Sequence, residues 1–104
     1  MASDDNLTVT VSEDDPTVVV AEGQIDSHTS TKLDEALAGY AATESISVDL
    51  SEVSFVDSSG LRVIVRAHKR HNEGGGGLTV VRPSQSVTRL LDMTGLTSEL
   101  TIRA

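Results

Sequence analysis

The chain has 104 residues, no cysteine, no tryptophan and only two aromatic side chains, which predicts one domain over residues 1–104 with an aliphatic core and excludes disulfides and thiolate zinc sites. Its 16 acidic and 8 basic residues give a formal net charge of −8, which argues against nucleic acid and anionic membranes as partners, because both are bound chiefly through Lys and Arg. No segment reaches the ~18 apolar residues of a membrane span, and the start lacks the pattern of a secretory signal, so a soluble, cytoplasmic protein is expected.

Two short strands are predicted at the start of the chain. Residues 7–11 alternate apolar and polar side chains, which is typical of a strand with one face on a core. Residues 14–16 (Asp-Asp-Pro) favour a turn, and residues 17–21 form a mostly β-branched run that is typical of a more fully covered strand. The short connection between them predicts a hairpin.

An amphipathic helix is predicted next. Residues 26–31 are rich in side chains that cap helices. The apolar residues that follow are spaced as on one helix face: Leu33, Ala36, Leu37, Tyr40 and Ala41. Residues 46–50 alternate again, and with the apolar residues 53–56 they predict a strand that runs into an apolar turn.

A second amphipathic helix is predicted over residues 58–72. Leu61, Ile64 and Val65 repeat with helical spacing. Most of the basic residues of this helix lie toward its C-terminus, where the macrodipole favours them. The four glycines at 74–77 predict the end of the helix and then a flexible connection.

The last third of the chain predicts a strand, a helix and a weak closing strand. The strand covers residues 78–81, and the short helix is capped by Ser84 or Ser86 and ended by Gly95. Residues 100–102 form a possible final strand. The order ββαβαβα with a closing β predicts an α/β fold: a single mixed β-sheet of four to five strands with helices packed on it.

Charge is distributed unevenly between the two halves of the chain. Residues 1–57 hold 13 acidic side chains and 1 basic one, whereas residues 58–104 hold 3 acidic and 7 basic ones. Two interpretations stay open, solubility alone or electrostatic steering of a protein partner.

Three oxygen-bearing side chains in a row stand where the third strand ends and the second helix begins: Asp57, Ser58 and Ser59. A helix start leaves unpaired N–H groups and a positive dipole end, which suit a capping side chain and would also suit a phosphate. Two serines are one more than a cap requires. The sequence therefore leaves two roles open here, simple capping and a modified or reactive serine.

A catalytic serine is the less supported interpretation. Serine hydrolases hold their nucleophile in a Gly-x-Ser-x-Gly turn, and Val56 or Asp57 occupies the position of the first glycine here. His28 could approach Ser58 with Asp26 behind it, but sequence does not establish that contact.

The other candidate residues favour structural roles. His68 and His71 could share a metal with Glu73, but a basic helix is a poor cation site, so His68 is expected at the edge of the core and His71 in solvent. The glycines at 74–77 precede a strand and match neither phosphate-binding glycine motif. No metal and no cofactor are expected.

Two charged residues flank this strand-to-helix corner. Asp26 follows the residues Gly23-Gln24-Ile25, and it is expected to cap the first helix or, alternatively, to be an exposed interaction residue. Arg62 is expected to be exposed to solvent, with assistance to an anion at the helix start as the alternative role.

Four stretches together resemble a known family. They are residues 22–26 (Glu-Gly-Gln-Ile-Asp), residues 48–61 with the core Asp-Ser-Ser-Gly-Leu, the helix-glycine-strand passage that ends at residues 82–84, and residues 91–96. They span most of the chain and are similar to the STAS domain, in its stand-alone form as a bacterial anti-sigma factor antagonist (anti-anti-sigma factor) of the SpoIIAA and RsbV type.

The resemblance implies partner switching in transcription regulation, as in a stress response. The unphosphorylated antagonist would bind an ATP-binding anti-sigma factor serine kinase and free the sigma factor. That kinase would then phosphorylate Ser58, and a serine phosphatase would reverse the modification. The chain would thus be a substrate and not an enzyme. The residues that would form the partner-binding surface with Ser58 are Asp26, Asp57, Ser59, Gly60 and Arg62.

One departure from the family concerns this surface. The family usually has a glycine where this chain has Arg62, which adds bulk and charge. Phosphate on Ser58 would add about −1.5 to −2 charges at a helix N-terminus, which the chain itself tolerates. We therefore expect a switch at the interface without refolding. Two alternatives remain, a STAS regulatory subunit of a membrane transporter complex and a small serine hydrolase.

Overall fold

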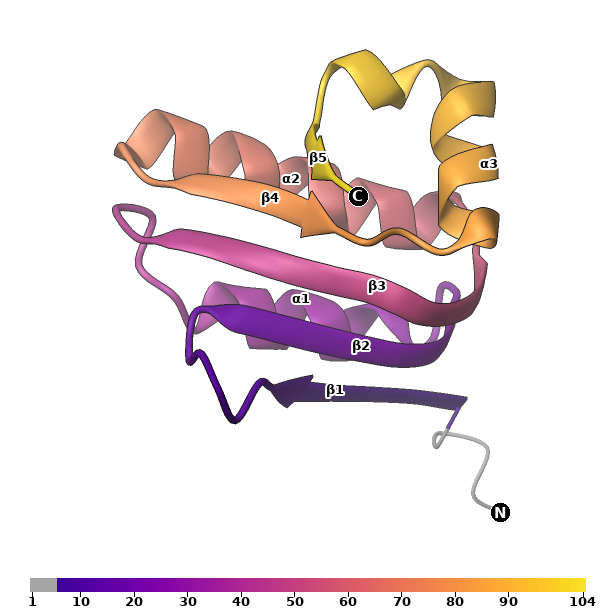
Figure 1. Ribbon diagram of the computed structural model, residues 1–104, viewed down its shortest axis with the longest axis horizontal. Coiled ribbons are helices and arrows are strands. Elements are labelled where there is room, and N and C mark those ends of the chain that lie inside the picture. Colours follow the sequence, from indigo (N-terminus) through magenta and orange to yellow (C-terminus); the bar gives the residue numbers. More distant parts are fainter. Residues whose placement is uncertain (1–5) are drawn as a thin grey trace.

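The computed structural model describes residues 6–104, which fold into one mixed sheet with helices packed on it (Figure 1). In chain order the elements are β1 (Leu7–Val11), β2 (Val18–Ile25), α1 (Ser30–Ala38), β3 (Ser45–Val56), α2 (Ser58–Gly74), β4 (Gly77–Val81), α3 (Gln85–Thr94), the 3-10 helix η2 (Leu96–Ser98) and β5 (Thr101–Arg103). The predicted order of elements is confirmed, including the closing strand.

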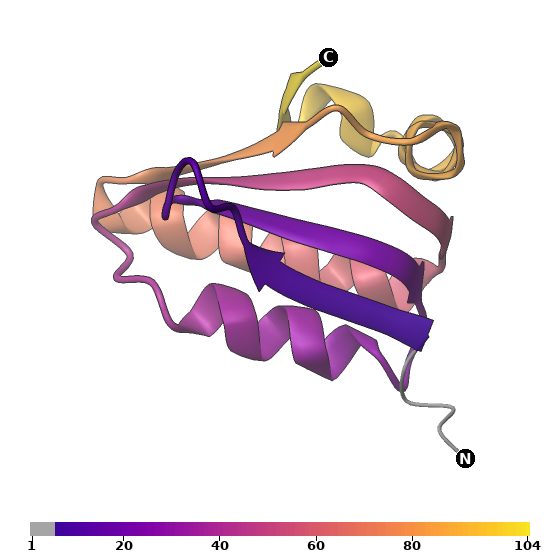
Figure 2. The same cartoon turned by 60° about the horizontal axis from the view of Figure 1, so that its bottom comes forward.

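The strands lie in the order β1-β2-β3-β4-β5, so chain neighbours are also sheet neighbours. Only β1 and β2 pair antiparallel, as the predicted hairpin; the other pairs are parallel. Helices α1 and α2 lie side by side under one face of the sheet, whereas α3 lies beyond the end of β3 (Figure 2). The carboxyl ends of β2 and β3 lie next to each other at one end of the sheet, because Ile25 pairs with Val56.

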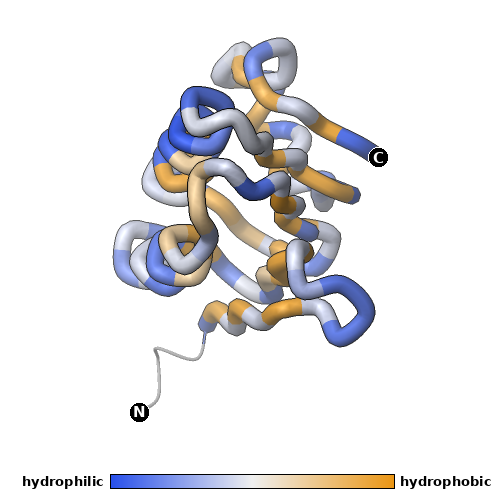
Figure 3. The backbone as a smooth tube through the Cα atoms, turned by 90° about the vertical axis from the view of Figure 1, so that its left-hand side faces the viewer, coloured by the Kyte–Doolittle hydropathy of each residue, from blue (hydrophilic) through white to orange (hydrophobic). Residues whose placement is uncertain are grey.

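The core between the sheet and these two helices is aliphatic, as predicted from the composition. Every buried apolar residue among those described is Ala, Val, Leu or Ile. The tube coloured by hydropathy shows the hydrophobic positions concentrated in the strands and on the inner sides of the helices, while outer turns and loops are hydrophilic (Figure 3). Leu33 and Leu37 of α1 and Leu61 and Ile64 of α2 contribute the predicted helical faces.

Three predicted boundaries are wrong. Strand β2 continues past the predicted end at residue 21 to Ile25. Helix α1 ends at Ala38, so Tyr40 and Ala41 lie outside it, and the Tyr40 hydroxyl donates to the carbonyl of Pro16 at 2.7 Å. Gly39, which disfavours helix, follows the last residue of α1. Residues 53–56 do not form a turn but continue β3, because β2 pairs with β3 up to Val56. That pairing requires two register shifts in the ladder.

The glycine run is a tight junction and not a flexible linker, which corrects our prediction. A Cβ on Gly74 would lie 2.4 Å from the Cβ of Ala42, and one on Gly76 would lie 2.0 Å from the carbonyl oxygen of Glu44. Gly75 ends α2 in the left-handed conformation, with φ of 96°. The predicted helix stop is therefore confirmed, but close backbone approach explains the glycines beside it.

His71 is fully buried, so its predicted solvent exposure is wrong. Its Nδ1 lies 2.8 Å from the carbonyl oxygen of Glu44, in the loop that leads into β3. Arg70, its neighbour, donates from Nη2 to the carbonyl of Tyr40 at 2.7 Å. The C-terminal turn of α2 is thus attached by side chains to the α1–β3 connection, which hydrophobic periodicity does not reveal.

Candidate functional site

The corner between β3 and α2 is organised by Asp57. This residue has extended backbone angles, and its carboxylate accepts hydrogen bonds from the N–H groups of Ser59 at 2.9 Å and Gly60 at 3.4 Å. Asp57 is therefore the N-cap of α2. Neither serine is needed for that role.

The hydroxyl of Ser58 has no structural partner in the described part of the chain. Ser58 is exposed as the first residue of α2, and its side chain makes no hydrogen bond to any residue between 6 and 104. Ser59, beside it, is half-buried. Capping thus falls to Asp57, and the Ser58 hydroxyl is left exposed.

Gly60 holds the start of α2 close to the sheet. A Cβ on this residue would lie 2.6 Å from Cγ2 of Ile25 and 2.8 Å from Cγ2 of Val56, the last residues of two paired strands. The N–H of Asp57 also donates to the carbonyl of Ile25 at 3.1 Å. The corner is therefore built on the ends of β2 and β3, and Ser58 projects from a rigid frame.

Asp26 lies on the neighbouring loop, at the end of β2. Its carboxylate accepts from the N–H groups of His28 and Thr29, each at 2.9 Å. The hydrogen bond from the Thr29 N–H, assisted by those from the His28 N–H and the Thr29 hydroxyl, outweighs desolvation and holds the pKa of Asp26 below its usual value. The formal N-cap of α1 is Thr29, so Asp26 stabilises the turn that leads into the helix and is only half-exposed.

Arg62 is exposed, as predicted, one helical turn after Ser58. Residues at this spacing lie on the same side of a helix. The end-of-strand pairing of Ile25 with Val56 brings the Asp26 loop beside the Asp57 corner. The tertiary structure thereby gathers the sequence-predicted residues at one end of the sheet, although 31 positions separate Asp26 from Asp57 along the chain.

The histidines show no catalytic or metal-binding arrangement. No hydrogen bond joins Ser58 to His28 among residues 6–104, and that same range contains no group of three His, Asp or Glu side chains placed to hold a metal ion. His68 is at the edge of the core as predicted, and its Nε2 lies 3.4 Å from Nδ2 of Asn72. No described helix is long and apolar enough to cross a membrane.

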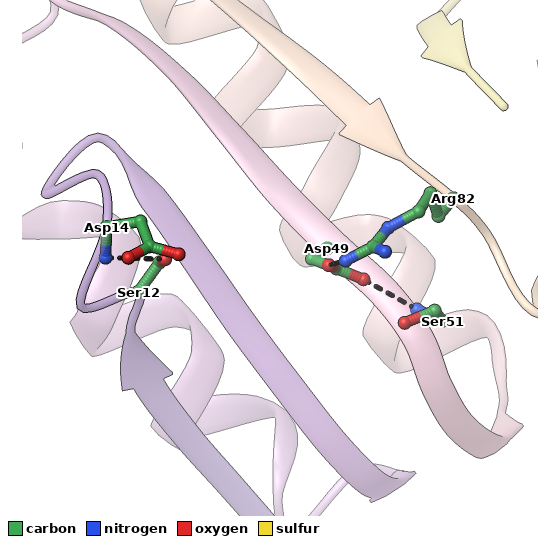
Figure 4. Close-up of polar contacts among 5 residues, drawn as sticks. All are labelled: Ser12, Asp14, Asp49, Ser51 and Arg82. Atoms are coloured by element: carbon green, nitrogen blue, oxygen red, sulfur yellow. Dashed lines mark hydrogen bonds and ion pairs between the residues drawn. The ribbon is translucent and has the colours of Figure 1, made fainter.

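A charged pair on the helix-free face of the sheet was not predicted (Figure 4). Asp49 of β3 is buried and pairs with the guanidinium of Arg82, while the Ser51 N–H donates to its Oδ1 at 3.0 Å. Burial disfavours the ionised carboxyl, but the bonds from Ser51 and Arg82 outweigh it and lower the pKa of Asp49. Figure 4 also shows the unrelated turn in which the Asp14 N–H donates to the Ser12 hydroxyl.

Arg82 holds an unusual backbone conformation. Its φ is 48°, the only positive value at a non-glycine residue in the described chain. Its N–H donates to the carbonyl of Arg103 at 2.7 Å. The period-two alternation of residues 46–50 predicts that Asp49 lies on the other face of the strand from Val48 and Leu50. Nothing local in the sequence indicated Arg82 as the partner of Asp49.

Comparison with known proteins identifies the family of this chain. The sequence profile of the STAS domain family matches residues 6–104. The anti-sigma-B factor antagonist of Listeria monocytogenes is 34% identical over 102 residues, which cover 94% of this chain and 90% of that protein. The anti-sigma F factor antagonist of Paenibacillus polymyxa is 40% identical over 83 residues, 76% of this chain and 70% of that one.

A solved structure agrees with the sheet and helix arrangement. The crystal structure of an anti-sigma factor antagonist from Mycobacterium paratuberculosis superimposes with a TM-score of 0.79 at 26% sequence identity. The match covers 98% of this chain and 88% of that one. The similarity therefore extends over nearly the whole chain.

Proposed function

Because the chain belongs to the STAS domain family, we propose that it is an anti-sigma factor antagonist whose binding to a protein partner is switched off by phosphorylation of Ser58. The observation that carries this proposal is the division of roles at the corner. Asp57 supplies the cap of α2, and this leaves an exposed hydroxyl on Ser58 without a hydrogen-bond partner between residues 6 and 104.

The partner is an ATP-binding serine kinase that otherwise holds a sigma factor. In this scheme the unphosphorylated chain binds the kinase and the sigma factor is released. The kinase transfers phosphate to Ser58, and a serine phosphatase later removes it. The chain is a substrate in this reaction and supplies no catalytic group. Its docking surface comprises Asp26, Asp57, Ser58, Ser59, Gly60 and Arg62.

The physical basis of the switch is a charge added where the chain tolerates it and the partner does not. Phosphate brings about −1.5 to −2 charges, and the N-terminal dipole of α2 favours a negative group at this position. A partner packed on the same corner meets that charge beside the carboxylate of Asp57. A loss of about 3 kcal/mol in binding free energy lowers affinity more than about 100-fold, so modest repulsion suffices.

The test uses Ser58→Ala and Ser58→Glu as parallel baits in lysate of the native organism. Partners are identified by mass spectrometry, and the fold of each bait is checked by circular dichroism. Ser45→Glu is the matched control, because it adds the same charge at an exposed serine at the opposite end of β3. We expect the Ser58→Ala and Ser45→Glu baits to capture an anti-sigma factor kinase and the Ser58→Glu bait to lose it.

Phosphorylation is then measured directly. The captured kinase, purified and supplied with ATP, should place phosphate on Ser58 of the wild-type chain and leave Ser58→Ala unmodified. Transporter subunits retained equally by all three baits would instead assign the chain to a membrane transporter complex. Ester hydrolysis by the purified chain that disappears in Ser58→Ala would make it a hydrolase.

A further inference from the structure

We propose that a shallow apolar groove beside Ser58, lined by Phe55, Leu90, Met93 and Arg89, is a second and phosphorylation-independent part of the kinase interface. It would take an apolar side chain of the kinase that is flanked by an acidic one. This inference rests on the proposed function and deepens it, because it concerns the same partner.

The groove contains two of the three large hydrophobic side chains that are exposed in the described chain. Phe55 is 48% exposed and Met93 is 75% exposed. The third, Val11, is 51% exposed and lies at the far end of the sheet, where it pairs with Val19 near the start of β2. Exposed apolar side chains that cluster, unlike isolated ones, mark interaction sites.

The walls of the groove are held in place by the fold. Phe55 is at the end of β3, and the Ser86 hydroxyl of α3 donates to the carbonyl of Ser54 at 2.9 Å, which fixes α3 against that strand. Leu90 and Met93 are three residues apart on α3 and therefore lie on the same side of this helix. The groove is thus preformed and needs little ordering on binding.

The groove lies close to Ser58, which favours the kinase as the partner that covers it. Phe55 is three residues from Ser58, so their Cα atoms are at most about 11 Å apart. A stable interface buries about 800 Å² per partner, which corresponds to a disc of about 16 Å radius. An interface of this size centred on Ser58 therefore extends as far as Phe55, and a desolvated aromatic near the centre of an interface is a typical binding hot spot.

Charge defines the chemistry of the occupant. Arg89 is exposed and forms no ion pair with any residue between 6 and 104, so an acidic group on the kinase complements it. The apolar walls carry no charge that a phosphate on Ser58 could repel. The apolar part of the groove therefore contributes affinity in both states, while the Ser58 corner and the acidic group near Arg89 supply the difference between them.

The probe is the purified kinase captured by the Ser58→Ala bait. Its affinity is measured for the wild-type chain and for Phe55→Ser, Met93→Ser and Arg89→Glu, each checked for folding by thermal unfolding. We expect Phe55→Ser and Met93→Ser to weaken binding about 10-fold or more and to raise KM for Ser58 phosphorylation with little change in kcat. Val11→Ser, the matched control at the far end of the sheet, should bind within about twofold of wild type.

The outcomes separate this inference from the proposed function. If Ser58→Glu abolishes binding but Met93→Ser and Phe55→Ser bind like wild type, the groove is not part of the interface and the proposed function stands. Met93 is exposed enough for its substitution to leave the core intact, which keeps the test valid if Phe55→Ser misfolds. If no kinase binds any form, or if Ser58→Glu binds like wild type, the proposed function fails and the groove proposal fails with it.

Discussion

The two ends of helix α2 differ in what their polar side chains do. At the C-terminal end, His71 is fully buried and its Nδ1 lies within hydrogen-bond distance of the Glu44 carbonyl, while Gly74 and Gly76 touch the neighbouring backbone. At the N-terminal end, the Asp57 carboxylate satisfies the helix, and the exposed Ser58 hydroxyl has no partner among the described residues. The C-terminal end is closely packed against its neighbours, whereas the N-terminal end leaves the Ser58 hydroxyl exposed.

This difference explains how a modification can alter binding without altering the fold. Helix α2 is fixed at its C-terminal turn and packed through Leu61 and Ile64, so we expect it to keep its position when phosphate is attached to Ser58. The proposed switch therefore needs no conformational change in this chain. The following predictions test whether the two ends differ as described.

The largest effect on stability is expected at the C-terminal end of α2. Gly76→Ala places a methyl group 2.0 Å from the Glu44 carbonyl oxygen, so the junction must open at a cost of about 3 kcal/mol. Urea unfolding measures the change. Gly77→Ala is the control, since nothing lies within 4 Å of its Cβ position, and it should stay within about 0.5 kcal/mol of wild type. Equal stability of the two variants would show that the junction is not tight.

The second effect concerns the sheet between the two ends. Asp49→Asn removes the charge that pairs with Arg82 and should cost about 2 kcal/mol at pH 7. The pKa of Asp49 is lowered in the folded state, so its contribution to stability is present above the ordinary carboxyl pKa. The contribution is lost as pH falls through the lower pKa of the folded state. Denaturant unfolding at several pH values should therefore show a shallower acid loss in Asp49→Asn. An unchanged pH profile would contradict this role.

A smaller effect is expected from the cap at the N-terminal end of α2. Asp57→Ala removes the acceptor for the Ser59 and Gly60 N–H groups and should destabilise the chain by about 1 kcal/mol. Asp57→Asn keeps a capping oxygen and should stay close to wild type in thermal unfolding. A loss as large in Asp57→Asn as in Asp57→Ala would mean that charge, and not capping, is what the helix requires.

The smallest effect is expected at the proposed phosphoacceptor. Ser58→Ala removes a hydroxyl that bonds to nothing between residues 6 and 104 and should change the free energy of unfolding by less than about 0.5 kcal/mol. Ser84→Ala is the comparison, because Ser84 caps α3 through the Val87 N–H and should lose about 1 kcal/mol. Similar losses of unfolding free energy in both variants would give Ser58 a structural role, and the two ends of α2 would then not differ as described.

Local patterns predicted most of the fold because each relied on contacts close in sequence. The alternation in residues 7–11 and 46–50 and the helical spacing of Leu61 and Ile64 depend on periodicity alone. The errors occurred where distant segments decide. Residues 53–56 became strand because β2 pairs with them, and the glycine run became a junction because the Ala42–Glu44 loop packs on it.

The candidate site divides in the same way. The sequence by itself determined the order of elements, the aliphatic core and the presence of three polar residues at a strand-to-helix corner, since these follow from composition and from spacing along one segment. Only the tertiary structure decided that Asp57 is the cap, that Asp26 lies beside it, and that Phe55 and Met93 share a groove there. The cap is a local choice among three adjacent oxygen-bearing residues, which spacing along the chain does not decide. The other two are relations between segments far apart in the chain, and they exist only once the core has packed.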